Sequence, residues 1–344
     1  IIKGNAGKVK EYPILGCDKT THYRNLIVNN KIDYVIIPEG YMLTDSVYEA
    51  TKGTPCKIIS ALHSKPGYER ERVYVNLIDS MFYNESILKR FRALLILIVY
   101  PLFYYIYTCR VMRKFKIAYD KSDRFILLSE RFFESFVQKY NIKDGGKKLA
   151  AIPNGLSFGN VFLNEEEYGQ KENICLIVGG LNEQQKRLSL AIKIWKQLEP
   201  LFPNWRLEIV GFGRSEPYYR NLVRKYNLKH LTFEGKQSPL KYYKKAKIFF
   251  MTSAFEGFGM TLTEAQQMGC VPVVINSYEA VHDIIEDGEN GYIAKDEYEF
   301  IDKVCNLIKD KELLKEMADK GLESCKKFQR ENIYEKYYSL LKDF

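Results

Sequence analysis

Short apolar runs alternate with amphipathic stretches along most of this 344-residue chain. Each run has the length of a strand, and most stretches between runs have the spacing of a surface helix. Such an alternation predicts β-α-β units, in which strands pair in parallel and helices cover the sheets. The chain is long enough to form two domains of this kind, each with its own core.

The positions of the runs predict individual elements. We expect strands at 33–38, 56–63, 124–129 and 148–155 in the N-terminal half, and at 173–180, 205–213, 230–235, 247–253 and 270–276 in the C-terminal half. Helices are expected at 130–141, 185–198, 215–227, 239–246 and 260–268, and a series of charged helices over 297–344. The polar segment 156–172 lacks a clear period and indicates a domain boundary. The predicted fold is α/β, with two doubly wound, Rossmann-like domains facing each other across a cleft. A single large open sheet is the alternative.

One segment departs from this alternation. Residues 93–109 form seventeen positions without a charged side chain, and basic residues flank them on both sides. The run is shorter than the ~20 apolar residues that a spanning helix needs, and Pro101 lies in its middle. A Tyr-rich apolar helix with basic edges is typical of attachment to an anionic membrane surface, which we favour for 89–116. A buried core helix and a membrane span are the alternatives.

The net charge of +9 favours anionic partners, such as a phosphorylated substrate, an acidic lipid surface or nucleic acid. We expect no nucleic-acid partner, because such a partner explains none of the glycines and paired glutamates described below. The seven cysteines are scattered without a C-x-x-C pair, and several lie in apolar runs. This usage predicts reduced, buried thiols of a cytosolic protein, and neither a zinc site nor a disulfide framework.

The segment FEGFGMTLTEA (255–265) lies between the apolar runs 247–253 and 270–276. Its glycines therefore follow a parallel strand at the carboxyl end, where open sheets bind their ligands. Gly257 and Gly259 admit a ligand close to the backbone. The first amides of the helix expected at 260–268 attract an anion, most naturally a phosphate.

Glu256 and Glu264 lie on either side of this phosphate position. A carboxylate beside a phosphate repels it but accepts hydrogen bonds from neutral hydroxyls further along the ligand. The arrangement predicts a ligand with hydroxyls, a diphosphate and hydroxyls again, which describes a nucleotide-sugar. The alternative is a pair of solvated glutamates.

EGFGMTLTEA, followed by GCVPVV, resembles the E-x7-E signature of family 4 retaining glycosyltransferases, which have the GT-B fold. IPNGLSF (152–158) is similar to the segment where that family's chain crosses between its domains. IVGFG (209–213) and FEGKQSPLKYYKKAKIFFMTS (233–253) resemble the parts that form its nucleotide pocket. DIIEDGENGYIA (283–294) is similar to its D/E-x-I-x-x-G-x-N-G stretch. The resemblance covers roughly residues 120–344, and the first hundred residues only loosely.

The resemblance implies a role for each matching residue. Glu264 would bind the ribose hydroxyls of the nucleotide, and Glu256 would contact the donor sugar. His63 resembles the histidine at the end of a first-domain strand that faces this sugar; a structural histidine is the alternative. We expect Glu256 and His63 to be the catalytic residues. The expected donor-binding residues are Lys186, Arg187, Gly180, Gly211, Gly213, Gly257, Phe258, Gly259, Met260, Thr261, Leu262 and Glu264.

One position departs from the family pattern. The family places an arginine and a lysine on the diphosphate, and here the segment reads VGGLNEQQKRLSLAI. Lys186 matches the lysine, but Gly180 occupies the position of the arginine. A lost charge-assisted hydrogen bond is worth about 1.5–3 kcal/mol, which corresponds to roughly 10- to 150-fold in donor binding or rate. Arg187 or a basic residue of the first domain is the expected substitute.

The resemblance also implies a domain plan. Residues 1–157 would form an acceptor-binding domain, residues 158–328 the donor-binding domain, and residues 329–344 a helix that packs back toward the first domain. The chain does not begin with Met, and no segment convincingly matches the family's first glycine-rich loop. We therefore expect this loop in a missing N-terminal segment.

The implied activity is a hexosyl-type transfer, with retention, from a UDP- or GDP-linked sugar to a glycan or lipid-linked acceptor. Such an enzyme would serve cell-surface polysaccharide or glycolipid synthesis from the cytoplasmic face of the membrane. We expect no cofactor and no metal, since the sequence has no Asp-x-Asp and no His/Cys cluster with ligand spacing. A GT-B-fold epimerase or phosphorylase, and a nucleotide-sugar binder with weak catalysis, are the alternatives.

Overall fold

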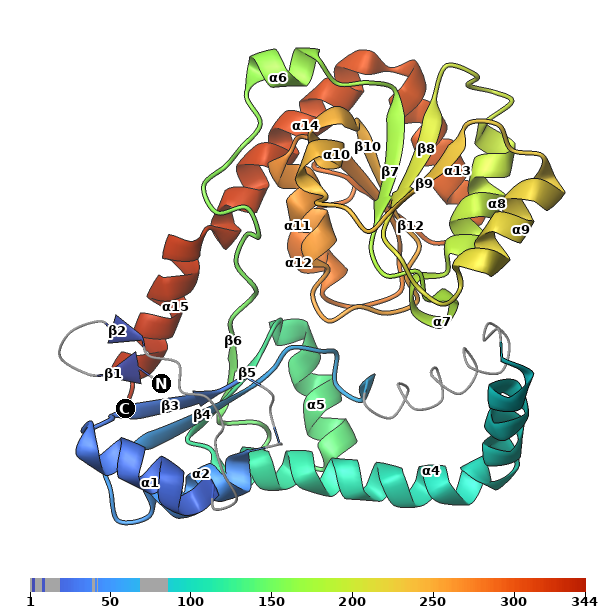
Figure 1. Cartoon of the computed structure of the whole chain (residues 1–344). Coiled ribbons are helices and arrows are strands. Elements are labelled where there is room, and N and C mark those ends of the chain that lie inside the picture. The colour runs from blue at the N-terminus through green and yellow to red at the C-terminus, as the bar shows by residue number, and fades with distance from the viewer. Residues whose placement is uncertain (1, 4–7, 10–18, 39–40, 42, 69–85) are drawn as a thin grey trace. The chain divides into compact units, whose positions relative to one another are not determined.

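The structure of this chain is a computed structural model that describes residues 2–3, 8–9, 19–38, 41, 43–68 and 86–344 (Figure 1). The chain divides into two compact units. Unit 1 comprises residues 1–71 and 100–153, and unit 2 comprises residues 72–99 and 154–344. Each unit is an α/β structure built on its own sheet, as the alternating sequence pattern predicts.

Unit 1 contains a six-stranded sheet in the order β2-β1-β3-β4-β5-β6. The strands β3 to β6 are parallel, and β1 is antiparallel to both β2 and β3. Buried positions nearly fill β4 and β5, as is typical of parallel strands covered on both faces. The strands are β1 (Ile2–Lys3), β2 (Lys8–Val9), β3 (Tyr34–Ile37), β4 (Lys57–Leu62), β5 (Arg124–Leu127) and β6 (Leu149–Ala151).

The four strands predicted for the N-terminal half are confirmed, whereas β1 and β2 are additional. Helix α5 forms part of the unit 1 core through an aromatic cluster. The Phe136 ring packs in a tilted arrangement 4.8 Å from that of Phe125 and 4.7 Å from that of Tyr140, measured between ring centroids. The helices of the N-terminal half are α1 (Lys19–Asn29), α2 (Thr44–Thr51), α4 (Ile87–Lys121) and α5 (Phe133–Tyr140).

Unit 2 contains a fully parallel six-stranded sheet in the order β12-β11-β10-β7-β8-β9. The strands are β7 (Ile174–Val178), β8 (Arg206–Val210), β9 (Leu231–Gly235), β10 (Ile248–Met251), β11 (Val271–Ile275) and β12 (Tyr292–Ala294). The five strands predicted here are confirmed, and β12 is additional. Counted from β9, the order is that of the Rossmann fold, whose chain direction along the sheet reverses between β7 and β10. This topological switch point is where such a sheet offers a crevice to a ligand.

Helices cover both faces of the unit 2 sheet (Figure 1). Helix α8 packs against α9 and α13, and α11 packs against α14. The core includes the fully buried Trp195 and an edge-to-face pair between Phe250 and Phe300. The helices are α6 (Glu165–Gly169), α7 (Glu183–Lys186), α8 (Leu188–Leu198), α9 (Glu216–Tyr226), α10 (Leu240–Lys245), α11 (Met260–Gln267), α12 (Val281–Ile284), α13 (Glu297–Lys309), α14 (Lys311–Ser324) and α15 (Arg330–Lys342).

Two local predictions differ from the structure. The helix predicted at 185–198 is interrupted, because Arg187 adopts a left-handed conformation with φ 46° between α7 and α8. The segment 156–172, predicted to be irregular, contains α6. This short helix begins at Asn164, which forms a capping box with Glu167. The expected packing of residues 329–344 toward the first domain stays a prediction.

The apolar segment 93–109 lies within α4, a helix of 35 residues that includes position 101, so the proline does not end it. The side chains of 97–104 lie outside the described ones. On either side of them, large apolar side chains are exposed: Phe91, Leu94, Leu95, Tyr105 and Ile106. Ala93 and Val111 are buried. Among the described residues, no helix is long and apolar enough to cross a membrane.

Candidate active site

The carboxyl ends of β7 and β10 meet at the switch point of the unit 2 sheet. The loop after β10 is hydrogen-bonded to α7, which follows β7. Ala254 donates its amide to the Gln185 carbonyl at 2.6 Å, and the Thr252 hydroxyl donates to the Lys186 carbonyl at 3.0 Å. These bonds hold the two loops together, so the residues of FEGFG lie next to those of α7.

Helix α11 begins in this loop at Gly259, which has φ 95°. A Cβ at this glycine would lie 2.4 Å from the Tyr278 hydroxyl, so both the backbone and the space require glycine. No side chain caps the first turn of α11. The Leu262 amide donates to the Gly259 carbonyl at 2.8 Å. The start of α11 thus presents main chain, with its positive dipole end, toward the site.

The side chains around this helix start divide into buried and accessible ones. Phe258 and Leu262 are 2% and 0% exposed, and Phe258 packs edge-to-face on Phe328. Any contact of these two residues with a donor would therefore use their main chain. Gly257 and Thr261 are half-buried, and Met260 is exposed.

Glu256 forms an ion pair with Lys186. The Lys186 Nζ lies 2.5 Å from Glu256 Oε1, and the two side chains are 18% and 11% exposed. Both residues were predicted to contact the donor, the lysine at the diphosphate and the glutamate at the sugar. The structure brings them into direct contact with each other.

Glu264 is held by two hydroxyl groups. The Ser157 hydroxyl donates to Oε1 at 2.6 Å, and the Tyr243 hydroxyl donates to Oε2 at 2.9 Å. Burial raises the pKa of Glu264, while these two hydrogen bonds and the charge of Lys186 lower it; the net shift is upward. The carboxylate therefore lies in a drier environment than an ordinary surface glutamate.

Gly211 and Gly213 allow the β8 loop to approach the β7 loop. A Cβ at Gly211 would lie 1.8 Å from the Gly179 carbonyl oxygen, and one at Gly213 would lie 2.4 Å from that of Leu181. The two loops are also joined by a hydrogen bond of 3.0 Å from the Leu181 amide to the Phe212 carbonyl. The glycines thus allow the close contact between the two loops.

Gly180, at the position of the family's arginine, and Arg187, its expected substitute, have different surroundings. Gly180 is exposed, and nothing lies within 4 Å of the position of a Cβ there. Arg187 directs its guanidinium to main chain: Nε donates to the Thr252 carbonyl at 2.9 Å and Nη2 to that of Ser253 at 3.0 Å. Burial lowers its pKa. Its guanidinium thus supports the β10 loop.

A family model described as "Glycosyl transferases group 1" matches residues 162–324. This range contains all six strands of the unit 2 sheet, the switch point, Lys186 and both glutamates. Residues 162–324 thus form a group 1 glycosyltransferase domain within unit 2.

Curated relatives of this chain include two bacterial proteins. One is the N-acetylgalactosamine-N,N'-diacetylbacillosaminyl-diphospho-undecaprenol 4-alpha-N-acetylgalactosaminyltransferase of Campylobacter jejuni, which is 26% identical over 230 residues, 65% of this chain and 61% of that protein. The other is an uncharacterized glycosyltransferase of Haemophilus influenzae, which is 26% identical over 186 residues, 53% of each chain. The chain thus spans little more than half the length of these relatives.

Solved structures share the fold of this chain. Anabaena HepE in complex with UDP superposes with a TM-score of 0.71 at 14% identity, over 94% of this chain and 82% of that one. The pneumococcal O-GlcNAc transferase GtfA in complex with UDP and GlcNAc gives a TM-score of 0.68 at 18% identity, over 94% of this chain and 60% of that one. At these identities the likeness is one of fold, which is of the GT-B class.

His63 is exposed and directly follows β4 in unit 1, outside the range of the group 1 match. Its position beside the donor sugar stays a prediction. The sequence reasoning missed Ser157 and Tyr243, the partners of Glu264. Both lie in segments that it quoted, IPNGLSF and PLKYYKKA, but no spacing pattern there connects them to a glutamate far along the chain.

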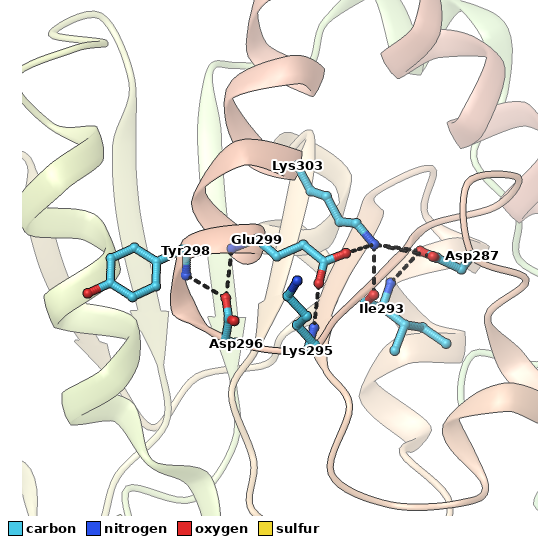
Figure 2. A network of polar contacts seen from close by, with 7 residues as sticks. All are labelled: Asp287, Ile293, Lys295, Asp296, Tyr298, Glu299 and Lys303. Carbon is cyan, nitrogen blue, oxygen red and sulfur yellow. Dashed lines mark hydrogen bonds and ion pairs between the residues drawn. The ribbon is translucent and has the colours of Figure 1, made fainter.

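The DGENG turn of the group 1 domain is held by its own side chains and by Lys303 of α13. Figure 2 shows Lys303 of α13 bonded to Asp287 at 3.1 Å and to the Ile293 carbonyl at 2.8 Å. Asp287 in turn accepts the Ile293 amide at 2.8 Å. The Asn290 side chain accepts the Glu286 amide and donates to the Ile284 carbonyl. These contacts indicate that the motif fixes the chain around β12.

Among the described residues, no group of three His, Cys, Asp or Glu side chains could hold a metal ion. The six described cysteines are free thiols, of which Cys109 is exposed, Cys305 is half-buried, and Cys56, Cys175, Cys270 and Cys325 are buried. Cys17 lies outside the described residues.

Proposed function

We propose that this chain transfers a sugar, with retention, from a UDP- or GDP-linked donor to a glycan or lipid-linked acceptor, as in surface polysaccharide or glycolipid synthesis. One observation carries the proposal. Lys186, the start of α11, Glu256 and Glu264 gather at the switch point of a sheet that matches the group 1 family. The cation and the helix dipole suit a diphosphate, and the two carboxylates suit the hydroxyls on either side of it.

Each group has one part of the donor to bind. Lys186 and the α11 amides would bind the diphosphate, Glu256 the donor sugar, and Glu264 the ribose hydroxyls. Because the α11 amides and Lys186 already supply positive charge, they would stabilise the charge that develops on the leaving phosphate. The same phosphate would help remove the proton of the acceptor hydroxyl. Residues 1–157, with His63, would bind the acceptor and face the sugar, and residues 158–328 would bind the donor.

The names of the relatives support this choice of substrates. The Campylobacter jejuni enzyme is named for a diphospho-undecaprenol acceptor, and the pneumococcal transferase was solved with UDP and GlcNAc. A lipid-linked acceptor and a UDP donor are therefore the first candidates. An epimerase, a phosphorylase or a binder without transfer would use the same donor pocket and differ in the product.

The test begins with binding. UDP- and GDP-sugars are screened by thermal unfolding, where a ligand at 100 times its Kd stabilises by about 2.7 kcal/mol. The best donor is then titrated into the Glu264→Ala variant, for which we expect at least tenfold weaker binding. Unchanged affinity would show that the pocket is assigned wrongly. Mass spectrometry after incubation with donor and acceptors separates transfer from isomerisation or from binding alone.

We also propose that the protein is cytoplasmic and peripheral on the inner face of the cytoplasmic membrane. The support comes from α4, whose exposed apolar side chains have exposed basic neighbours at Arg92, Arg110, Arg113 and Lys114. Apolar side chains would enter the interface while the basic ones meet anionic headgroups, each worth about 1 kcal/mol near the surface. This placement would bring the enzyme to a lipid-linked acceptor.

Flotation with vesicles of phosphatidylglycerol and phosphatidylcholine tests this attachment. We expect the wild type to float and the combined variant Phe91→Glu, Leu94→Glu, Leu95→Glu and Ile106→Glu to remain in solution. Leu201→Glu is a control for an exposed apolar residue elsewhere, because Leu201 is 60% exposed in the turn after α8. Equal flotation of the α4 variant and the wild type would contradict the membrane proposal and leave the transfer proposal intact.

A further inference from the structure

Both carboxylate oxygens of Glu264 are bonded to hydroxyl donors within unit 2. Oε1 accepts from Ser157 at 2.6 Å, and Oε2 accepts from Tyr243 at 2.9 Å. The Tyr243 ring is fully buried, so its hydroxyl has a fixed position. A carboxylate offers about four lone-pair sites, two on each oxygen. One site on each oxygen is therefore taken, and one on each is left.

The main chain of Tyr243 is hydrogen-bonded to a buried lysine. Lys171 is 6% exposed, and its Nζ donates to the Tyr243 carbonyl at 2.9 Å and to the Ala246 carbonyl at 2.5 Å. These carbonyls lie at the end of α10, where a cation is favourable to the helix dipole. Cys270 donates its thiol to the same two carbonyls. The end of α10 is thus fixed by hydrogen bonds from both Lys171 and Cys270.

Ser157 is held by the helix that carries Glu264. The Gln267 side chain of α11 donates to the carbonyls of Gly159 and Val161, both at 2.8 Å. The Leu163 amide donates back to the Gln267 carbonyl at 3.3 Å. The segment 157–163 is therefore bonded to α11 at both Glu264 and Gln267. In addition, Phe158 contacts the Tyr243 ring edge-to-face at 6.0 Å between centroids.

We propose that Tyr243 and Ser157 are positioning residues, which fix the Glu264 carboxylate so that the remaining lone pair of each oxygen receives one hydroxyl of a ribose 2′,3′-diol. The proposal rests on the proposed function and adds to it the two residues that orient Glu264. The preference for a ribonucleoside diphosphate over its 2′-deoxy counterpart is the property that reports on this orientation. If either the Tyr243 or the Ser157 hydroxyl were removed, the Glu264 carboxylate would be free to rotate. Only one of its oxygens would then remain oriented toward a ribose hydroxyl.

The test uses calorimetric titration of the full chain. UDP and GDP are first compared on the wild type. The nucleotide that binds more tightly, and its 2′-deoxy counterpart, are then titrated into each variant. We expect Tyr243→Phe and Ser157→Ala each to weaken binding of the ribonucleotide by about tenfold, the effect of one hydrogen bond to a charged group. We expect a smaller loss for the 2′-deoxy nucleotide, which has one hydroxyl of the diol. The preference for ribose over deoxyribose therefore falls.

A double-mutant cycle shows whether the hydroxyls act through Glu264. In the Glu264→Ala background, Tyr243→Phe and Ser157→Ala should have no further effect on nucleotide affinity. Tyr219→Phe is the matched control, since Tyr219 is also fully buried but lies on α9. It should change neither the affinity nor the preference for ribose. Two variants on separate segments keep the test valid if one of them fails to fold.

Three results would overturn the inference. Tyr243→Phe and Ser157→Ala could leave the ribonucleotide affinity unchanged, could weaken both nucleotides equally, or could weaken binding as much without Glu264 as with it. Each of these would leave the proposed function standing as long as Glu264→Ala weakens binding. If Glu264→Ala itself has no effect, the pocket assignment fails instead.

Discussion

The two glutamates of FEGFGMTLTEA are both largely buried, but their surroundings differ. Glu256 faces a cation, the Nζ of Lys186, at 2.5 Å. Glu264 faces two neutral hydroxyls, those of Ser157 and Tyr243. A charge compensated by a cation can lose that partner to a competing anion. A charge held by hydroxyls is not affected in this way.

The difference bears on what happens when a diphosphate arrives. The phosphate would compete with Glu256 for Lys186, so this end of the segment has to change its contacts. Glu264, in the proposed function, would keep both hydroxyl partners and bind the ribose in addition. The contacts of Glu256 would thus change when a diphosphate binds, whereas the contacts of Glu264 would stay the same. The predictions below test this contrast.

The largest effect is expected when the ion pair is broken. Lys186→Met leaves the Glu256 carboxylate buried without its cation, which we expect to lower the free energy of unfolding by about 3 kcal/mol. Urea denaturation measures this change. In Tyr243→Phe, Glu264 keeps the Ser157 hydroxyl, so the loss should be nearer to 1 kcal/mol.

An exposed ion pair provides the control for this experiment. Lys193 lies 3.6 Å from Glu297, and its side chain is 55% exposed. Lys193→Met should cost less than about 1 kcal/mol. If Lys186→Met and Lys193→Met lowered the free energy of unfolding equally, burial would not strengthen the Lys186–Glu256 pair. The contrast between the two glutamates would then have no basis.

The next effect is a gain in binding. Gly180 stands where the family pattern has an arginine, and a side chain there meets open space. Gly180→Arg would add a second cation for the diphosphate, so Lys186 need not leave Glu256 completely. We expect about tenfold tighter binding of UDP by calorimetry, equivalent to about 1.4 kcal/mol. Gly180→Met, which adds length without charge, should not improve binding. An equal gain in both variants would contradict the electrostatic reason.

The smallest effect concerns pH. Burial raises the pKa of Glu264 above the ordinary value of 4.5, and its hydrogen bond from Tyr243 opposes this rise. Protonation replaces an acceptor of ribose hydroxyls by a donor, so UDP affinity should fall as the pH is lowered through that raised pKa. Tyr243→Phe removes the opposing bond and should move this fall to higher pH. Titration calorimetry over a pH series that begins below 4.5, the ordinary pKa of a glutamate, and rises from there tests both expectations. A pH profile identical to that of the wild type would contradict them.

The raised pKa of Glu264 affects stability in the opposite direction from UDP affinity: its contribution to stability falls as the pH rises. The folded protein holds the Glu264 proton more tightly than the unfolded chain, so protonated Glu264 favours the folded state. Its contribution to the free energy of unfolding is therefore largest below the ordinary pKa and falls as the pH rises through the folded-state value. The difference in unfolding free energy between Glu264→Gln and wild type should grow in favour of the variant over this window.

The sequence predicted the parts of the molecule that depend on local pattern. Apolar runs gave the five strands β7 to β11, and the glycines near Glu256 indicated a turn at the end of β10. Side-chain partners depend on segments that meet only after folding. Ser157 and Glu264 are 107 residues apart, so no local period could pair them. The left-handed Arg187 was missed for the same reason, because its guanidinium binds carbonyls 65 and 66 residues away.

The segment that follows the crossing into unit 2 has a practical consequence for building hybrid enzymes. Residues 157–163 are bonded to α11 through Ser157 and Gln267, and the Leu156 amide donates to the Phe328 carbonyl at 2.9 Å. In the structure they belong to unit 2, although they lie next to the N-terminal half in sequence. A graft that exchanges the N-terminal residues between relatives should therefore be joined before residue 154, so that each hybrid retains the Ser157 hydroxyl on Glu264.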